Sequence, residues 1–387
     1  MRYHSYLNSA AAIIDSYKGD IPFAVFIKKY FSANKKYGGR DRKQIAALCY
    51  NFYRLGKALP KLPVSEKIIV ATFLCEQADN DFLQFHKPEW NAVVAQPLSE
   101  KLKIAGLSTE LVFPWPDELS AGIEVEGFGN SFFQQPDLFL RVRPGKTEAV
   151  IGKLSGAGLA FQKLENDCIA LPNASKLDAI VDIDKEVIIQ DFNSQRVLHF
   201  LKEISPGMPH PVRVWDCCAA SGGKSIQVYD ILNGELELTV SDIRESILSN
   251  LKKRFETAGI SEFRSFLADL TDADCPLPVA GCQLIICDAP CTGSGTWSRT
   301  TEQLYYFKKK TIDEYAALQR KIVANVIPYL QQDGLFIYIT CSVFKKENEA
   351  LADFIKEKFH LQLLQMELLK GYDKKADSMF VAVFKKG

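Results

Sequence analysis

The sequence predicts an α/β protein in which a doubly wound parallel sheet follows an all-α unit and a small α+β unit. From about residue 212 onward, apolar runs rich in β-forming residues alternate with helical stretches, which is the pattern of βαβ units. From residue 1 to about 115, apolar residues recur at spacings of three and four with almost no alternation, which is typical of helices. The 387 residues, 47% of them hydrophobic, are enough for two or three domains with their own cores.

The predicted domain boundaries follow changes in these patterns. Residues 1–115 form the helical domain, and the segment VFPWPDELSAG (112–122), rich in proline and aromatic residues, is expected to join it to the next unit. Residues 116–185 mix short strands with one helix and form the small α+β subdomain. Residues 186–387 form the sheet domain, with strands expected in VRVWDCC, LELTVSD, FRSFLAD, CQLIICDAP and GLFIYITC. Ligands bind at the carboxyl ends of such strands, so the residues there are the candidates for function.

The N-terminal region carries a charge asymmetry that the overall net charge of zero conceals. Residues 1–62 hold 12 Lys and Arg against 3 Asp and Glu, net +9, whereas residues 63–130 hold 4 against 11, net −7. A basic cluster of this kind suits the phosphate backbone of a nucleic acid. A solvated, lysine-rich helix surface explains it equally well, so the composition leaves both interpretations open. The cluster includes Lys35, Lys36, Arg40 and Lys43.

Cysteine usage and the lack of targeting signals set the expected environment. No apolar run reaches the roughly 18 residues of a membrane span, and the first 20 residues lack the order of a signal peptide, so we expect a cytoplasmic protein with no membrane partner. The ten cysteines should then be thiols. Cys282, Cys287 and Cys291 lie within and after one predicted strand with no histidine nearby, which is not the spacing of a zinc site. We therefore expect no metal, and a monomeric chain.

The stretch VWDCCAASGGKS (214–225) predicts a strand, a tight glycine turn and a helix start, an arrangement in which helix N–H groups meet a ligand. Its end, GGKS, resembles half of the phosphate loop of an NTPase. That motif requires a glycine where Cys218 stands, so the nucleotide hydrolase is the weaker interpretation. The stronger one is a pocket for an adenosyl group.

Acidic residues at the following strand ends support the adenosyl pocket. Asp242 lies 20 residues beyond Gly222, the offset of a ribose-binding acid. Asp269 ends the third predicted strand, where it can accept a hydrogen bond from an adenine amino group. Acids at successive strand ends, Asp288 included, repel a triphosphate that lacks magnesium. We therefore favour an adenosine-bearing cofactor.

Two further strand ends carry a cysteine beside a turn, Cys291 in DAPC and Cys341 in TCS. A partly exposed thiol whose pKa falls below about 8.5 is a strong nucleophile. Either cysteine alone is more simply a small core residue. Both together, beside a methyl-donor pocket, fit methylation of carbon 5 of a pyrimidine. A thiolate added to carbon 6 makes carbon 5 nucleophilic, and a second thiol can assist the elimination that follows.

These motifs recur together in a known family. They are QDFNSQ (190–195), DCCAASGGKS (216–225), SDI (241–243), LAD (267–269), DAPCTGSGTWSR (288–299), TCSVFKKENE (340–349) and DSMFVAVFKK (377–386). Over roughly residues 130–387 the chain resembles the RsmB/Nop/Sun family of S-adenosylmethionine-dependent RNA cytosine-5 methyltransferases, in particular the bacterial Sun or Fmu type that acts on small-subunit ribosomal RNA. The resemblance implies a Rossmann-like class I methyltransferase core with S-adenosyl-L-methionine as cofactor.

The resemblance also implies roles for individual residues. Cys341 is the nucleophile that attacks carbon 6, Cys291 assists product release, and Asp288 binds the polar edge of the cytosine. The chain departs from the family pattern at Ser221, where the family usually has a proline, and this change loosens the cofactor turn. The expected cofactor-binding residues are Cys218, Ala219, Ala220, Ser221, Gly222, Gly223, Lys224, Asp242, Asp269 and Asp288.

Two further segments resemble RNA-binding parts of the family. GGRDRKQIAALCYNFYR (38–54) resembles the signature of a NusB-like helical domain, and FLRVRPGK (139–146) resembles the opening of the family's small α+β RNA-binding subdomain. We expect Asp41 and Arg42 to form an internal ion pair instead of contacting RNA. Where the family commonly has paired arginines after the Pro-Cys turn, only Arg299 remains, because Ser298 takes the first position. The expected RNA-binding residues are Lys35, Lys36, Arg40, Lys43, Arg141, Arg143 and Arg299.

The sequence therefore predicts an RNA cytosine-5 methyltransferase that acts on 16S ribosomal RNA through a covalent cysteine adduct. Transfer RNA is the alternative substrate, and no residue pattern selects one cytosine. A ribosome-assembly factor without catalysis is a second alternative, disfavoured because a binding protein has no chemical need for Cys341. A DNA cytosine methyltransferase is a third, disfavoured because such enzymes carry the nucleophile in the Pro-Cys motif and have a large target-recognition insert.

Overall fold

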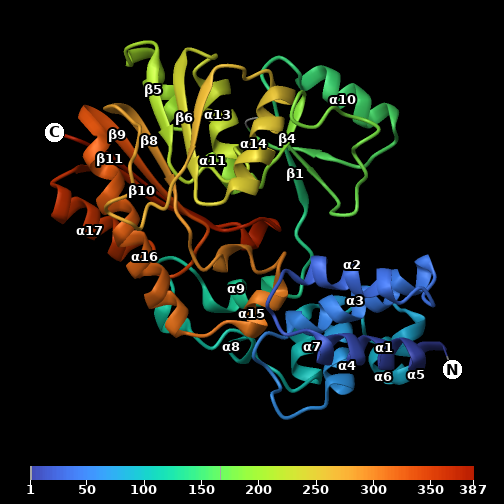
Figure 1. The fold of residues 1–387 in the computed structure, drawn as a ribbon. Helices are drawn as coiled ribbons and strands as arrows, with labels where there is room; N and C mark the ends of the chain where they lie inside the picture. The colour runs from blue at the N-terminus through green and yellow to red at the C-terminus, as the bar shows by residue number, and fades with distance from the viewer. Residues whose placement is uncertain (1, 166) are drawn as a thin grey trace. The chain divides into compact units, whose positions relative to one another are not determined.

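The computed structural model describes residues 2–165 and 167–387, which divide into two compact units (Figure 1). The first unit comprises the chain up to Leu119 together with Ile123–Gln135 and Thr296–Lys309. The second comprises Ser120–Gly122, Pro136–Gly295 and Lys310–Gly387. Among the helices within these described ranges, none is long and apolar enough to cross a membrane.

The first unit is helical, as the spacing of apolar residues predicted. In α3 the residues Ile45, Leu48, Cys49, Phe52 and Tyr53 recur at helical spacing and are all buried. The helices of this unit are α1 (Arg2–Ser16), α2 (Phe23–Ala33), α3 (Gly39–Arg54), α4 (Val64–Cys75), α5 (Asp81–His86), α6 (Pro88–Asn91), α7 (Leu98–Ile104), α8 (Thr109–Val112), η1 (Pro116–Glu118), α9 (Val125–Ser131) and α15 (Thr301–Tyr306).

Two segments that lie outside residues 1–115 complete the helical unit. Arg54, buried at the end of α3, donates to the carbonyl oxygens of Phe132 at 2.5 Å and Gln134 at 2.9 Å, which fastens the segment after α9. The backbone N–H of Phe23 donates to Glu302 of α15 at 3.2 Å. These contacts join residues far apart in the sequence, so the helical unit is larger than the predicted domain.

A small antiparallel sheet opens the second unit, in the order β2-β3-β1-β4. Its strands are β1 (Leu138–Val142), β2 (Gln162–Lys163), β3 (Cys168–Leu171) and β4 (Val187–Ile189), with α10 (Thr147–Gly156) between β1 and β2. Val150 and Leu154 of α10 pack on the buried residues of this sheet. The sheet includes β4, which the predicted boundary at residue 185 had assigned to the following domain.

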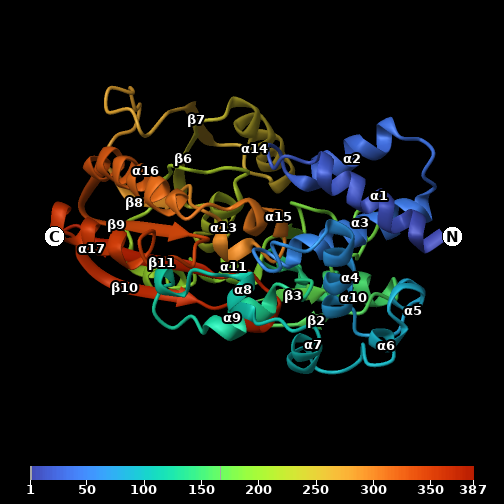
Figure 2. The ribbon, with the colours of Figure 1, turned by 90° about the horizontal axis from the view of Figure 1, so that it is seen from below.

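The main sheet has seven strands in the order β10-β11-β9-β8-β5-β6-β7. Figure 2 shows β7 at one edge of this sheet and β10 at the other. β9, β8, β5, β6 and β7 are mutually parallel, whereas β11 runs antiparallel to both of its neighbours. The strands are β5 (Val212–Asp216), β6 (Leu236–Asp242), β7 (Phe263–Leu267), β8 (Cys282–Asp288), β9 (Leu330–Thr340), β10 (Gln362–Leu369) and β11 (Met379–Lys385). The strand order reverses between β5 and β8, and ligands bind at such a switch point.

Helices cover both faces of the main sheet because successive strand residues point to opposite sides. Leu284 and Ile286 of β8 pack in a cluster with residues of α13 and α14, whereas Ile285 and Cys287 pack with α16 and α17. The remaining helices of this unit are α11 (Phe192–Arg196), α12 (Leu201–Ile204), α13 (Gly223–Ile231), α14 (Glu245–Ala258), α16 (Lys310–Val326) and α17 (Glu349–Phe359). The doubly wound α/β core, the α+β subdomain and the helical N-terminal region are thus confirmed.

Candidate active site

The loop between β5 and α13 holds the predicted cofactor residues in a tight turn. Ala220 and Gly222 both have positive φ, 46° and 83°. A Cβ on Gly222 would lie 2.6 Å from the ring of Phe255, so glycine is required there for both conformation and space. Ala219 donates its N–H to the carbonyl of Ser241 at 2.9 Å, which ties the loop to the end of β6.

The predicted cofactor acids lie at the carboxyl ends of two neighbouring strands. Asp242 ends β6, is nearly buried, and accepts hydrogen bonds from the Ala220 N–H at 3.1 Å and from Arg244 Nε at 3.0 Å. Asp269 lies two residues beyond the end of β7 and is exposed. Its carboxylate accepts from the N–H and hydroxyl of Thr271 at 2.9 and 2.6 Å, and this bonding lowers its pKa.

Asp216, the last residue of β5, is an acid that the sequence reasoning did not single out. Its Oδ2 accepts from the Ser225 hydroxyl at 2.6 Å. Its Oδ1 is buried and has no hydrogen-bond partner within the described part of the chain. Burial raises the pKa of Asp216 to about 7, although the Ser225 hydrogen bond opposes the shift. A buried oxygen without a donor is suited to a ligand that brings one.

Lys224 and Asp288 form an ion pair between the cofactor loop and the end of β8. The Lys224 ammonium lies 2.7 Å from the Asp288 carboxylate, and the side chains are 11% and 29% exposed. Burial alone would lower the pKa of Lys224, but Asp288 and the nearby Cys341 raise it above its ordinary value. A fixed positive charge therefore lies beside Cys341.

Cys291 and Cys341, fifty positions apart, bring their Sγ atoms to 3.3 Å from each other. β8 and β9 are parallel neighbours, with Asp288 opposite Ile339, so the turns that follow them lie side by side. Both cysteines are partly exposed. The contact with Cys341, burial and the charge of Glu347 raise the pKa of Cys291 well above that of an ordinary thiol.

A fully buried glutamate, Glu347, joins the two cysteine turns. Its carboxylate accepts from the Thr292 N–H at 2.8 Å and the Thr292 hydroxyl at 2.6 Å. It also accepts from the Ser342 hydroxyl at 2.5 Å and from Gln319 Nε2 at 3.2 Å. Thr292 follows Cys291 and Ser342 follows Cys341, so one carboxylate holds both turns. Burial raises the pKa of Glu347 in spite of these hydrogen bonds.

Three other thiols lie close together where the loop after β5 meets the end of β8. The Sγ atoms of Cys217, Cys218 and Cys287 lie within 4.8 Å of one another, a juxtaposition that the spacing argument against metal did not consider. Structural zinc normally takes four ligands. No fourth His, Cys, Asp or Glu ligand atom of the described residues meets the same distance, and Cys217 and Cys287 also belong to the packed core.

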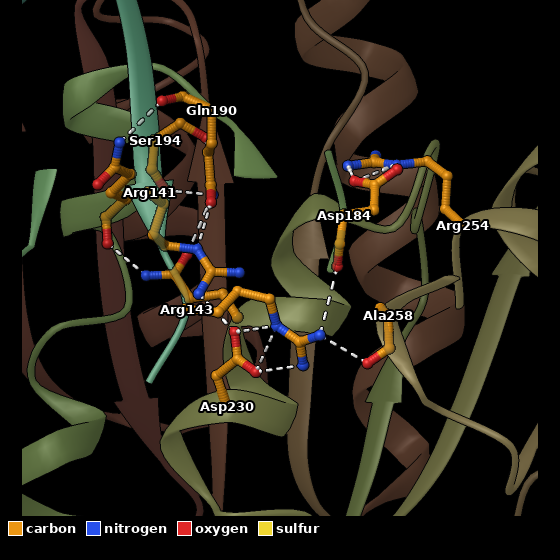
Figure 3. A network of polar contacts seen from close by, with 10 residues as sticks. Arg141, Arg143, Asp184, Gln190, Ser194, Asp230, Arg254 and Ala258 are labelled. Carbon is orange, nitrogen blue, oxygen red and sulfur yellow. Dashed lines mark hydrogen bonds and ion pairs between the residues drawn. The ribbon is translucent and has the colours of Figure 1, made fainter. Parts of the chain in front are cut away.

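Arg141 and Arg143, the predicted phosphate contacts, form ion pairs inside the protein. Both guanidinium groups bind the Asp230 carboxylate, at 2.6 and 2.7 Å (Figure 3). Arg141 also donates to Gln190 at 2.9 Å, and Arg143 donates to the Ala258 carbonyl at 2.6 Å. The arginine side chains are only 8% and 12% exposed, so their charge is used inside the protein. The β1 sequence could not show this because Asp230 lies on α13.

The predicted N-terminal RNA contacts lie on an accessible surface. Lys35, Lys36, Arg40 and Lys43 are all exposed, and Arg299, which follows η3 (Ser294–Thr296) and precedes α15 in the chain, is half-buried.

The predicted ion pair between Asp41 and Arg42 is absent from the described residues. Asp41 instead accepts from the Tyr6 hydroxyl at 2.5 Å and lies 3.5 Å from Arg2. Arg42 donates to the Tyr37 carbonyl at 2.9 Å. Both residues keep internal roles, but with other partners, because successive helix residues point in different directions.

The fold is that of a Rossmann-like methyltransferase core, and comparison with known proteins gives the family that part of the chain matches. Residues 209–384 match the sequence model of the 16S rRNA methyltransferase RsmB/F family. Over these residues the match confirms the resemblance drawn from the motifs.

Curated relatives agree with the family match. The chain is 26% identical over 295 residues to ribosomal RNA small subunit methyltransferase B of Enterobacter sp., covering 73% of this chain and 60% of the relative. It is 26% identical over 234 residues to a probable ribosomal RNA small subunit methyltransferase B of Synechocystis sp., covering 59% and 51%. The chain thus spans about half the length of these curated relatives.

Solved structures share the fold at low sequence identity. The crystal structure of PH0851 covers 98% of both chains with a TM-score of 0.72 and 18% identity. NSun6 from Pyrococcus horikoshii, solved with SFG, covers 72% of this chain and 96% of its own, with a TM-score of 0.60 and 14% identity. These similarities support the fold described above for the sheet domain and for the other parts of the chain that they cover.

Proposed function

We propose that this protein transfers a methyl group from S-adenosyl-L-methionine to carbon 5 of a cytosine in RNA, with ribosomal RNA as the favoured substrate. The observation that carries the proposal is the 3.3 Å separation of the Cys291 and Cys341 thiols beside the Lys224–Asp288 pair. The names of the curated relatives, which are ribosomal RNA methyltransferases, support the choice of substrate.

The residues present fit the cofactor. Asp242 places an acceptor at the end of β6, where a ribose is expected, and the unpartnered Asp216 oxygen can accept from an amino group. Gly222 and Gly223 open α13, whose N-terminal N–H groups suit a carboxylate. When bound, the cofactor supplies an electrophilic methyl group.

Cys341 performs the first covalent step. Its thiolate forms a bond to carbon 6 of the cytosine, and the displaced electron pair makes carbon 5 nucleophilic. The Lys224 ammonium supplies a positive charge near this sulfur. After methylation of carbon 5, that carbon loses its proton, the C5–C6 double bond forms again, and Cys341 leaves as a thiolate.

Cys291 is assigned to the elimination. As a thiolate it takes the carbon-5 proton, and its raised pKa makes it the stronger base when it is deprotonated. We assign Asp288, which accepts a hydrogen bond from Lys224, to the polar edge of the cytosine. The two cysteines thus differ in their surroundings, with Lys224 near Cys341 and Glu347 near Cys291.

The test is adduct formation by the Cys291→Ala variant. With methyl-labelled donor and total RNA, the variant should accumulate a labelled protein–RNA adduct that survives denaturation, whereas Cys291→Ala combined with Cys341→Ala should not. Ribonuclease should remove the RNA and deoxyribonuclease should not. Removal of the attached nucleic acid by deoxyribonuclease would indicate a DNA enzyme, and wild-type protein that binds RNA without transferring methyl would indicate an assembly factor.

A further inference from the structure

The cofactor turn of this chain is held by an arginine that comes from outside the loop. Arg254 of α14 donates from Nη1 to the Ser221 carbonyl at 2.7 Å and to the Ser221 hydroxyl at 3.0 Å. On the other side of the turn, the Ala220 N–H is held by Asp242. The left-handed conformation of Ala220 carries a penalty for a residue with a side chain, so the turn needs such contacts.

Asp184, from the segment that leads into β4 of the small sheet, fixes Arg254 in place. Its carboxylate accepts from Arg254 Nε at 3.0 and 2.9 Å and from Nη2 at 2.6 Å, a geometry shown in Figure 3. The Asp184 side chain is 13% exposed and the Arg254 side chain is 23% exposed, so solvent screens this pair less than it screens a surface pair. Asp184 itself has a positive φ of 67°, a conformation that aspartate adopts more readily than most residues with a side chain.

The same network continues into the small subdomain. Arg143, directly after β1, donates to the Asp184 carbonyl at 3.3 Å and to the carbonyl of Ala258, the last residue of α14. Figure 3 shows Arg143 between Asp230 and this helix end. The segment before β4, α14 and the cofactor turn are therefore linked by one continuous set of polar contacts.

We propose that Asp184 and Arg254 are positioning residues for cofactor binding, which hold the turn at Ser221 in the conformation that binds the cofactor. The inference rests on the proposed function, because it assumes that residues 218–224 bind S-adenosyl-L-methionine. Proline fixes φ and reduces the freedom of a turn. In this chain the two Ser221 oxygens accept hydrogen bonds from Arg254, and these bonds restrict the turn from outside the loop.

The first experiment measures donor affinity by calorimetry. Arg254→Met and Asp184→Asn should each weaken S-adenosyl-L-methionine binding by roughly 10-fold, the size of one charge-assisted hydrogen bond, with little change in kcat at saturating donor. Lys253→Met is the matched control, because it removes an exposed cation from the position directly before Arg254 in α14. Hydrogen exchange of residues 218–224 without donor should speed up in the two clamp variants and not in the control.

The second experiment is a rescue. Among the residues that the structure describes, the Ser221 N–H has no hydrogen-bond partner, so proline removes no bond there. Ser221→Pro should restore donor affinity in the Arg254→Met background. If Arg254→Met binds donor as wild type does, or if Ser221→Pro fails to rescue it, the inference is overturned. If wild type itself does not bind the donor, the proposed function fails instead.

Discussion

The Sγ atoms of Cys291 and Cys341 lie 3.3 Å apart, and the separation is maintained by the turns on which the two residues stand. Because β8 and β9 are parallel neighbours, their ends approach each other, but the turns beyond them need a further tie. Glu347 supplies it by accepting hydrogen bonds from Thr292 and Ser342. The geometry of the two thiols therefore depends on one buried carboxylate.

Glu347→Gln should slow covalent attack without affecting the donor site. The amide has one accepting oxygen where the carboxylate has two, so at least one turn loses a hydrogen bond to a charged group, worth about 1.5–3 kcal/mol. We expect the single-turnover rate of adduct formation to fall roughly 10- to 100-fold. Calorimetry should show unchanged donor affinity. Glu349→Gln is the control, because Glu349 binds Ser120 and Ala121 instead of the cysteine turns. A wild-type rate of adduct formation in Glu347→Gln would exclude this role of Glu347.

Cys341→Ala should abolish methyl transfer while leaving donor affinity within about 1 kcal/mol of wild type, because the thiol bonds to the pyrimidine and not to the donor. Quantified label transfer and calorimetry on the same preparation check both halves. Residual turnover near the wild-type rate would remove Cys341 from the nucleophile's role.

Asp216→Asn should change how the stability of the cofactor-free protein depends on pH. The folded pKa of Asp216 is about 7 against an ordinary 3.8, so between about pH 4 and pH 7 the folded state holds a proton that the unfolded state has released. This contribution to stability is fully present below about pH 4 and is lost progressively as pH rises from 4 to 7. Asparagine cannot ionise, so urea unfolding should show the variant close to wild type at pH 4 and more stable at pH 8. An equal difference at both pH values would contradict the assignment.

Asp230→Ala should destabilise the second unit by about 3–5 kcal/mol, because it leaves the Arg141 and Arg143 charges without their carboxylate in a mostly buried site. Chemical denaturation measures this loss. Arg141→Met should lower stability while leaving the salt dependence of RNA binding unchanged. A reduced salt dependence would restore Arg141 as a phosphate ligand.

Neutralising Lys35, Lys36, Arg40 and Lys43 should weaken RNA binding and reduce its salt dependence by up to about 0.7–0.9 in log–log slope for each RNA phosphate that the protein no longer neutralises. These residues are exposed, so melting temperature should hardly move. Arg42→Ala should instead lower the melting temperature and leave the salt dependence of RNA binding unchanged, because Arg42 donates to the Tyr37 carbonyl. An unchanged slope in the variant with all four substitutions would assign the cluster to a solvated surface.

The sequence by itself determined the α/β core, the helical N-terminal region and the strand ends that carry Asp242, Asp288, Cys291 and Cys341. These follow from local signals, namely hydrophobic periodicity, glycine turns and residues placed directly after apolar runs. Parallel strands bring such ends to one edge of a sheet, so the site could be inferred without knowing the strand order.

Only the tertiary structure decided which basic side chains remain exposed for a partner and which residues hold the Cys291 and Cys341 thiols in position. Arg141 and Arg143 looked like an exposed basic edge, but their partner Asp230 lies on another element, some ninety positions away for each. Glu347, Asp184 and Arg254 likewise act through contacts with distant segments, such as the 70 positions between Asp184 and Arg254. A sequence pattern reports the periodicity of one segment, whereas ion pairs and buried hydrogen bonds depend on which segments the fold brings together.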